Sequence, residues 1–123
     1  MTPSHRLILA ILATIALAGC DSMELTIAVE GGSDDSLVVA NANAEPWRDA
    51  RLVVEAVERD NSTSVCADRT VVEWQPNATV TVPKCGDKVR LTLTTGGETA
   101  RFSYVNGQLF RRFGRKEVPV TGS

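Results

Sequence analysis

Histidine is almost absent from this chain. Of 123 residues only one is a histidine, His5, close to the amino terminus. The remaining chain therefore lacks the base on which Ser-His-Asp and Cys-His nucleophiles depend. It also lacks the commonest zinc ligand. We expect no catalytic residue, no metal and no other cofactor, and hence not an enzyme.

A pair of carboxylates is a catalytic arrangement that does not need histidine, and it remains a possible alternative. Hydrolysis of a glycoside needs two carboxyl groups held about 5–10 Å apart across a cleft. A small domain of the type described below rarely offers such a cleft, so solvated side chains are the favoured interpretation. The residues in question are Glu55, Glu58, Glu73 and Glu98.

Helical periodicity is also absent after residue 22, and so are internal repeats. Apolar and polar residues alternate with period 2, as half-buried strands require, and turn signals recur every 8–12 residues. Asn106-Gly107 is the strongest hairpin signal. The sequence predicts an all-β fold, a single small antiparallel sandwich of seven or eight strands, with a closed eight-stranded barrel as the alternative. The expected strand segments are 25–29, 36–42, 51–58, 70–74, 79–82, 88–94, 100–104, 108–112 and, as a last edge, 117–120.

The only long apolar run lies at the amino terminus. It covers Leu7–Ala18, 12 residues, which is too short to span a bilayer as a helix of about 20 residues. It suits the apolar core of a signal peptide. The run ends in Leu17-Ala18-Gly19-Cys20, which resembles the lipobox of bacterial lipoprotein precursors.

That resemblance implies a cellular location and a membrane anchor. Residues 1–19 would form a signal helix that is removed, and Cys20 would carry a diacylglycerol and an acylated amine. Two or more acyl chains hold a protein stably on its membrane. Residues 20–123 would then be a lipid-anchored domain facing the periplasm. Asp21 resembles the inner-membrane retention signal of enteric lipoproteins, with the outer membrane as the alternative; an ordinary secretory leader is the competing interpretation of the whole segment.

Charge is unevenly distributed along the chain. The formal net charge is −2, but residues 20–85 carry −7 and residues 86–123 carry +4. Two halves of opposite sign can attract each other across one small fold, which is the favoured interpretation. The alternative is that the basic end faces an anionic surface. For an envelope domain of net negative charge we expect no nucleic-acid partner.

Two cysteines follow Cys20. An oxidising compartment and an even number of cysteines favour a disulfide between Cys66 and Cys85. The loop between them would contribute roughly 3 kcal/mol of stability. The spacing is not CxxC, and two thiolates are too few for a zinc site.

The segment Val38–Val54 resembles the region around the second and third strands of immunoglobulin-like modules. A strand bearing asparagine leads through a loop with Trp47 into an apolar strand. The cysteine spacing is shorter than that of the usual disulfide between the sheets of antibody domains. The resemblance therefore implies an immunoglobulin-like sandwich outside the antibody type.

Two features are candidates for binding. The densest basic cluster contains Arg111, Arg112, Arg115 and Lys116. These residues would bind lipid headgroups or an acidic partner. Alternatively, they would protect an edge strand from aggregation with another sheet. Trp47 follows Pro46 in a predicted loop, where it either anchors a partner or plugs the end of the sandwich.

The favoured hypothesis is a membrane-anchored, non-enzymatic module that binds another envelope protein. The mature chain is also similar in size, anchoring and disulfide use to the periplasmic lysozyme-inhibitor lipoproteins, which makes a protein inhibitor the second hypothesis. A carboxylate-dependent hydrolase is the third.

Overall fold

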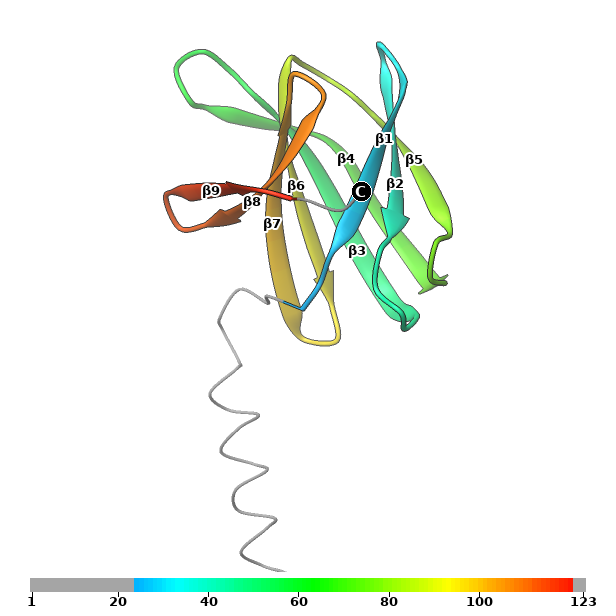
Figure 1. The fold of residues 1–123 in the computed structure, drawn as a ribbon. Coiled ribbons are helices and arrows are strands. Elements are labelled where there is room, and N and C mark those ends of the chain that lie inside the picture. Colours follow the sequence, from blue (N-terminus) through cyan, green and yellow to red (C-terminus); the bar gives the residue numbers. More distant parts are fainter. Residues whose placement is uncertain (1–23, 121–123) are drawn as a thin grey trace, which may run out of the picture.

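The computed structural model describes residues 24–120, and these form two packed antiparallel sheets (Figure 1). The predicted signal helix, Cys20 and Asp21 lie outside the described residues. No helix that could span a membrane is present in the described part of the chain. The strands are β1 (Ile27–Ser33), β2 (Ser36–Asn41), β3 (Trp47–Val57), β4 (Thr63–Trp74), β5 (Thr79–Pro83), β6 (Lys88–Thr95), β7 (Glu98–Val105), β8 (Gln108–Phe113) and β9 (Lys116–Pro119).

The strand order is that of an immunoglobulin-like sandwich. One sheet has the order β1-β2-β5 and the other β4-β3-β6-β7-β8-β9. The chain crosses between the sheets after β2, β4 and β5, so that strands one, two and five face strands three, six and seven. The predicted sandwich is confirmed, although residues 24–120 form nine strands instead of seven or eight. The closed barrel is wrong, because the two sheets keep four separate edges.

Alternating residues of both sheets build the core. In β6, Val89, Leu91 and Leu93 are fully buried between polar neighbours that face out. β3 buries every second residue from Ala50 onward in the same way, because it lies between two strands of the larger sheet. The largest fully buried side chains include Trp74, Phe102, Ile27, Leu37, Leu52, Val39 and Val82.

Strand β4 is longer than the sequence predicts. Only residues 70–74 were expected, whereas the strand begins at Thr63. β4 is an edge strand whose side chains are almost all exposed, including Val65 at 62% and Val72 at 74%. Only Ala67, Val71 and Trp74 of this strand pack against the core, so its sequence lacks a regular period-2 alternation of hydrophobicity.

Strand β3 also begins earlier than predicted, at Trp47. The sequence predicts a start at Arg51, because Pro46 and the polar residues around it interrupt the strand pattern. Asp49 has a positive φ of 48°, yet the ladder continues on both sides of it. The irregular residue therefore lies within the strand instead of ending it.

The predicted disulfide is confirmed, and it lies at an irregularity of the larger sheet. Val54 pairs with Ala67 and Glu55 pairs with Val65, so Cys66 is the extra residue of a β-bulge. Cys66 is bonded to Cys85 in the connection between β5 and β6. The bond ties the edge strand to the chain segment that crosses between the sheets.

Candidate binding surfaces and an end cavity

The predicted basic cluster divides between the two faces of the β8–β9 hairpin. Arg111 points inward: its guanidinium lies 5.3 Å from the ring centroid of Phe102 and 5.7 Å from that of Phe113. It also donates a hydrogen bond to the backbone carbonyl of Leu25. Arg111 is therefore part of the packing between the hairpin and the segment that precedes β1.

Arg112 points to the opposite side, the outer face of the larger sheet. Arg112 pairs with Arg101 on the neighbouring strand β7. Arg90 on β6 pairs with Ser103, the next residue of β7 that faces the same side as Arg101. Facing like charges repel each other across neighbouring strands. We call Arg90, Arg101 and Arg112 the arginine face, because they lie on three adjacent strands with the same orientation.

Glu117 on β9 lies beside this face. It is the direct cross-strand neighbour of Arg112, and Lys88 Nζ lies 3.3 Å from its Oε1. Partial burial alone would raise the pKa of Glu117, but the hydrogen bond from Lys88 and the charges of Lys88 and Arg112 help to lower it below its usual value. The carboxylate thereby offsets part of the repulsion within the arginine face.

Arg115 and Lys116 lie at the tip of the hairpin and are exposed. The turn begins at Gly114, whose φ of 61° is a conformation that side chains disfavour. Figure 1 shows the hairpin (orange to red) projecting sideways from the sandwich. Its two tip cations are thus presented away from the core.

Two ion pairs among residues 24–120 each lie within one of the two charged halves of the chain. Arg51 and Asp68 form a two-pronged pair at 2.9 and 2.6 Å, and both belong to the acidic half. The hydrogen bond from Arg51 lowers the pKa of Asp68. Lys88 and Glu117 both belong to the basic half. The expected attraction between the two halves stays a prediction, because neither pair tests it.

Trp47 plugs the end of the sandwich. It is only 5% exposed, and its ring packs edge to face on Trp74 with centroids 5.3 Å apart. Of the two roles predicted for Trp47, the structure shows the plug and not an exposed anchor. The physical reason is the cross-strand pairing of Trp47 with Trp74, which places both indoles on the inner face.

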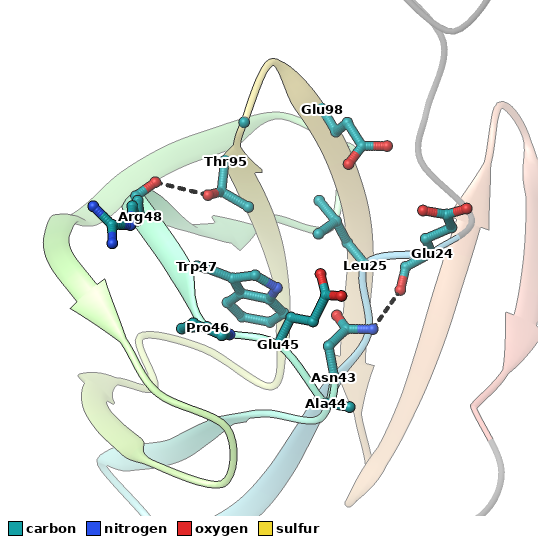
Figure 2. A pocket seen from close by; sticks show the side chains of 11 residues that line it. Glu24, Leu25, Asn43, Ala44, Glu45, Pro46, Trp47, Arg48, Thr95 and Glu98 are labelled. Atoms are coloured by element: carbon teal, nitrogen blue, oxygen red, sulfur yellow. Dashed lines mark hydrogen bonds between the residues drawn. The ribbon is translucent and has the colours of Figure 1, made fainter. Parts of the chain in front are cut away.

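A cavity of about 550 Å³ lies next to Trp47, at the end of the sandwich where the described chain begins (Figure 2). It is formed by the first residues of the described chain, the β2–β3 loop and the β6–β7 turn. It contains carboxylates from all three segments. The lining residues are Glu24, Leu25, Asn43, Ala44, Glu45, Pro46, Trp47, Arg48, Thr95, Gly96 and Glu98.

Side-chain hydrogen bonds fix the walls of this cavity. The fully buried Asn41 donates to the carbonyls of Glu45 (2.9 Å) and Trp74 (3.0 Å). Asn43 donates to the carbonyl of Glu24 at 2.7 Å and accepts from the amide of Thr26 at 3.0 Å. The bonds of Asn43 attach the β2–β3 loop to the segment that precedes β1.

The remaining wall, the β6–β7 turn, is attached by Thr95. Its hydroxyl donates to the carbonyl of Arg48 at 2.8 Å, a contact between residues 47 positions apart in sequence. The dashed lines in Figure 2 mark this bond and the Asn43–Glu24 bond. The cavity is therefore built by side chains that reach across the fold.

The carboxylates considered for hydrolysis are dispersed. Glu98 lines the end cavity, whereas Glu58 lines a second cavity beside Cys85 and Lys88. Glu55 belongs to β3 and Glu73 to the edge strand β4. Across residues 24–120, no group of three or more histidine, cysteine, aspartate or glutamate side chains is placed to hold a metal ion.

Comparison with protein-family models, with curated proteins and with solved structures gives no match to this chain. The fold and the candidate sites are therefore inferred from the residues of this chain alone. The sequence pattern places Asn41 in a strand that leads to a Trp-containing loop, but it does not identify Asn41 as a structural residue. The signal that would have identified it is a polar residue in a buried register position of β2, where Leu37 and Val39 precede it.

Proposed function

We propose that this protein is a lipid-anchored, non-enzymatic binding module of the bacterial cell envelope. The lipobox-like sequence that ends in Cys20 supports the anchor, and the small sandwich supports a recognition role. The anchor would confine the domain to a membrane surface, which raises its effective concentration near partners in the same compartment. Asp21 favours the inner membrane.

The observation that supports binding is the arginine face. Its three cations come from adjacent strands and point the same way. The Nε atoms of Arg90 and Arg112 are buried and have no hydrogen-bond partner among the described residues. Charged donors of this kind bind carboxylates strongly and with defined geometry. We therefore propose an acidic envelope protein as the partner, with Arg115 and Lys116 at the rim of the contact.

The anchor is tested separately from the partner. In the native host, Cys20→Ala should move the protein from the membrane fraction to the soluble periplasmic fraction and abolish incorporation of a labelled fatty acid. Persistent membrane association without label would contradict the anchor.

The partner is tested by crosslinking the full-length lipidated protein in cells. A variant with Arg101→Gln, Arg112→Gln and Arg115→Gln should lose the captured protein. Arg111 stays unchanged because it contacts Leu25 and two phenylalanine rings. The matched control is Arg59→Gln, an exposed cation outside the arginine face, which should capture the partner normally. Equal capture by both variants would overturn the arginine face as the binding surface.

A further inference from the structure

We propose that Glu117 occupies the arginine face of the free protein in place of the partner's carboxylate, and that the partner binds by exchanging one of its own carboxylates for Glu117. This inference rests on the proposed function, because it concerns the same surface and the same acidic partner. It adds a defined place of contact, between Arg90 and Arg112, and a residue of this chain that competes for that place.

Buried side-chain donors without a partner lie together on the arginine face. Among residues 24–120, these atoms are Nε of Arg90, Nε of Arg112 and Oγ of Ser103. Arg90 is the direct cross-strand neighbour of the fully buried Ser103. Arg112 pairs with the residue two positions before Ser103, so it is the diagonal neighbour on the other side, at about 7–8 Å. Two guanidinium groups therefore flank one hydroxyl, and all three groups lack an acceptor.

The charge of this part of the sheet favours a carboxylate as that acceptor. A buried donor without a partner is costly, and a carboxylate satisfies a guanidinium with a charge-assisted hydrogen bond. Cations outnumber carboxylates on the outer face of β3 and β6–β9 around Ser103. The cations are Lys88, Arg90, Arg101 and Arg112, and the carboxylates are Glu55 and Glu117.

Glu117 is the carboxylate that this chain itself brings to the place. It is the direct cross-strand neighbour of Arg112. Its Oε1 lies 3.3 Å from Lys88 Nζ, although β7 and β8 separate the two strands that carry these residues. Three strand spacings in a flat sheet amount to about 14 Å. The contact therefore requires the sheet to curve, and the curvature brings the carboxylate of β9 toward the arginines of β6 and β8.

The contact that holds Glu117 is weak. At 3.3 Å it is longer than the roughly 2.7–2.9 Å of a strong charge-assisted bond, and both arginine Nε atoms are left without an acceptor. By contrast, Arg51 holds Asp68 with two hydrogen bonds of 2.9 and 2.6 Å. The side chain of Glu117 is also 33% exposed, so water reaches it. Glu117 thus shows that a carboxylate fits at this place, and it is held loosely enough to be replaced.

Exchange follows from the burial of the donors. An incoming carboxylate reaches the Nε atoms of Arg90 and Arg112 only after a neighbouring side chain moves, because solvent has no access to either atom. Outward rotation of Glu117 places its carboxylate in water and avoids repulsion between two carboxylates at one place. It also releases Lys88 to the incoming group. Competition by Glu117 therefore lowers the affinity of the arginine face for its partner.

The test measures binding of a hexaglutamate peptide to the full-length lipidated protein in a neutral detergent, by fluorescence anisotropy. Low salt is used, because salt screens interactions between exposed charges. Glu117→Gln should bind the peptide about tenfold more tightly than the wild type, since a competing charged group is removed. Glu55→Gln is the matched control: it removes the same charge beside Arg90, and it should strengthen binding by less than about threefold.

Glu117→Asp separates the contact from the charge. It keeps the net charge, but the side chain is shorter by one methylene group, so its carboxylate is drawn away from Lys88. We expect this variant to bind the peptide about threefold more tightly than the wild type, because the competing contact is weakened while the net charge is the same. Thermal denaturation followed by circular dichroism checks that each variant is folded.

The outcomes distinguish the exchange from the proposed function. Equal affinity of the wild type and Glu117→Gln would overturn the exchange, and so would an equal gain in Glu117→Gln and Glu55→Gln. In either case the proposed function stands if the variant with Arg101→Gln, Arg112→Gln and Arg115→Gln loses the peptide. Absence of peptide binding by both the wild type and Glu117→Gln would overturn the arginine face as a carboxylate-binding surface, and the exchange with it.

Discussion

Trp47 and Trp74 face each other across the β3–β4 ladder, with their ring planes 79° apart. The pair closes one end of the core beside the cavity. Aromatic pairs in this geometry add stability beyond their buried area. The two residues are 27 positions apart in sequence, and their contact joins the first residue of β3 to the last residue of β4.

Replacing Trp74 should be severely destabilising. Trp74 is 1% exposed and its indole N–H is bonded to Ala78. Trp74→Ala should lower the free energy of unfolding by about 3–5 kcal/mol, measured by urea denaturation followed by circular dichroism. Val72→Ala, at a residue 74% exposed on the same strand, should change it by less than about 0.5 kcal/mol. Similar values for both variants would show that the indole pair does not close the core.

Asn41 should matter more for stability than any exposed polar residue. Asn41→Ala leaves the carbonyls of Glu45 and Trp74 without their donors and the amide of Asn43 without its acceptor. We expect a loss of about 3 kcal/mol, because each buried group without a partner costs about 1–3 kcal/mol. Thr70→Ala on the exposed edge strand is the control, and chemical denaturation is the measurement. A loss below 1 kcal/mol would contradict the role of Asn41.

Removing the disulfide should destabilise the sandwich without changing its topology. The bridge spans a sequence separation of 19, for which the chain-entropy estimate is roughly 3 kcal/mol. The Cys66→Ser/Cys85→Ser double variant should lose that amount in urea denaturation. The wild-type protein under reducing conditions should behave like the variant, and a difference between the two would point to effects of the serines themselves.

Substitutions of Arg111 and Arg115 should differ in their effect on stability, although both residues belong to one basic cluster in the sequence. Arg111→Ala removes two cation–π contacts and a charged donor to Leu25, so we expect a loss of about 2 kcal/mol. Arg115→Ala at the exposed tip should lower stability by less than about 0.5 kcal/mol. Thermal denaturation distinguishes the two. Equal effects would mean that Arg111 is not part of the packing.

Glu117 should make the β8–β9 hairpin sensitive to acid. Its pKa is lowered in the folded protein, so its carboxylate stabilises the fold above the ordinary glutamate value of about 4.3. That contribution is lost as the pH falls through the lowered pKa. Carboxyl NMR of Glu117 should show a midpoint below the ordinary value, and Lys88→Ala should raise it. An unchanged midpoint in the variant would exclude the contact with Lys88 as a cause.

The sequence predicted well those strands that have one buried face. In β6 and β7 the alternation is regular and the turns carry glycine, as at Gly96-Gly97 and Asn106-Gly107. It failed where the pattern depends on tertiary neighbours. The first six residues of β4 are exposed except for Ala67, which packs against the core. Strand β3 begins directly after Pro46 and contains Asp49, whose φ is positive.

The candidate sites were less predictable for the same reason. Arg111 and Arg112 are adjacent in sequence, yet strand geometry directs them to opposite faces, one into packing and one outward. The cavity was not foreseen because Glu24, Glu45 and Glu98 come from segments that only the fold brings together. Proximity in sequence was a poor guide to proximity in space.

The bulge at Cys66 has a consequence for self-association. β4 is a 12-residue strand at the edge of the larger sheet, the type of edge to which another chain can add. An added strand needs an evenly spaced row of amides and carbonyls, and the extra residue at Cys66 interrupts that row. Because the disulfide joins Cys66 to Cys85, the oxidised protein holds this extra residue in place, and the interrupted row disfavours addition of a strand from another chain at this edge.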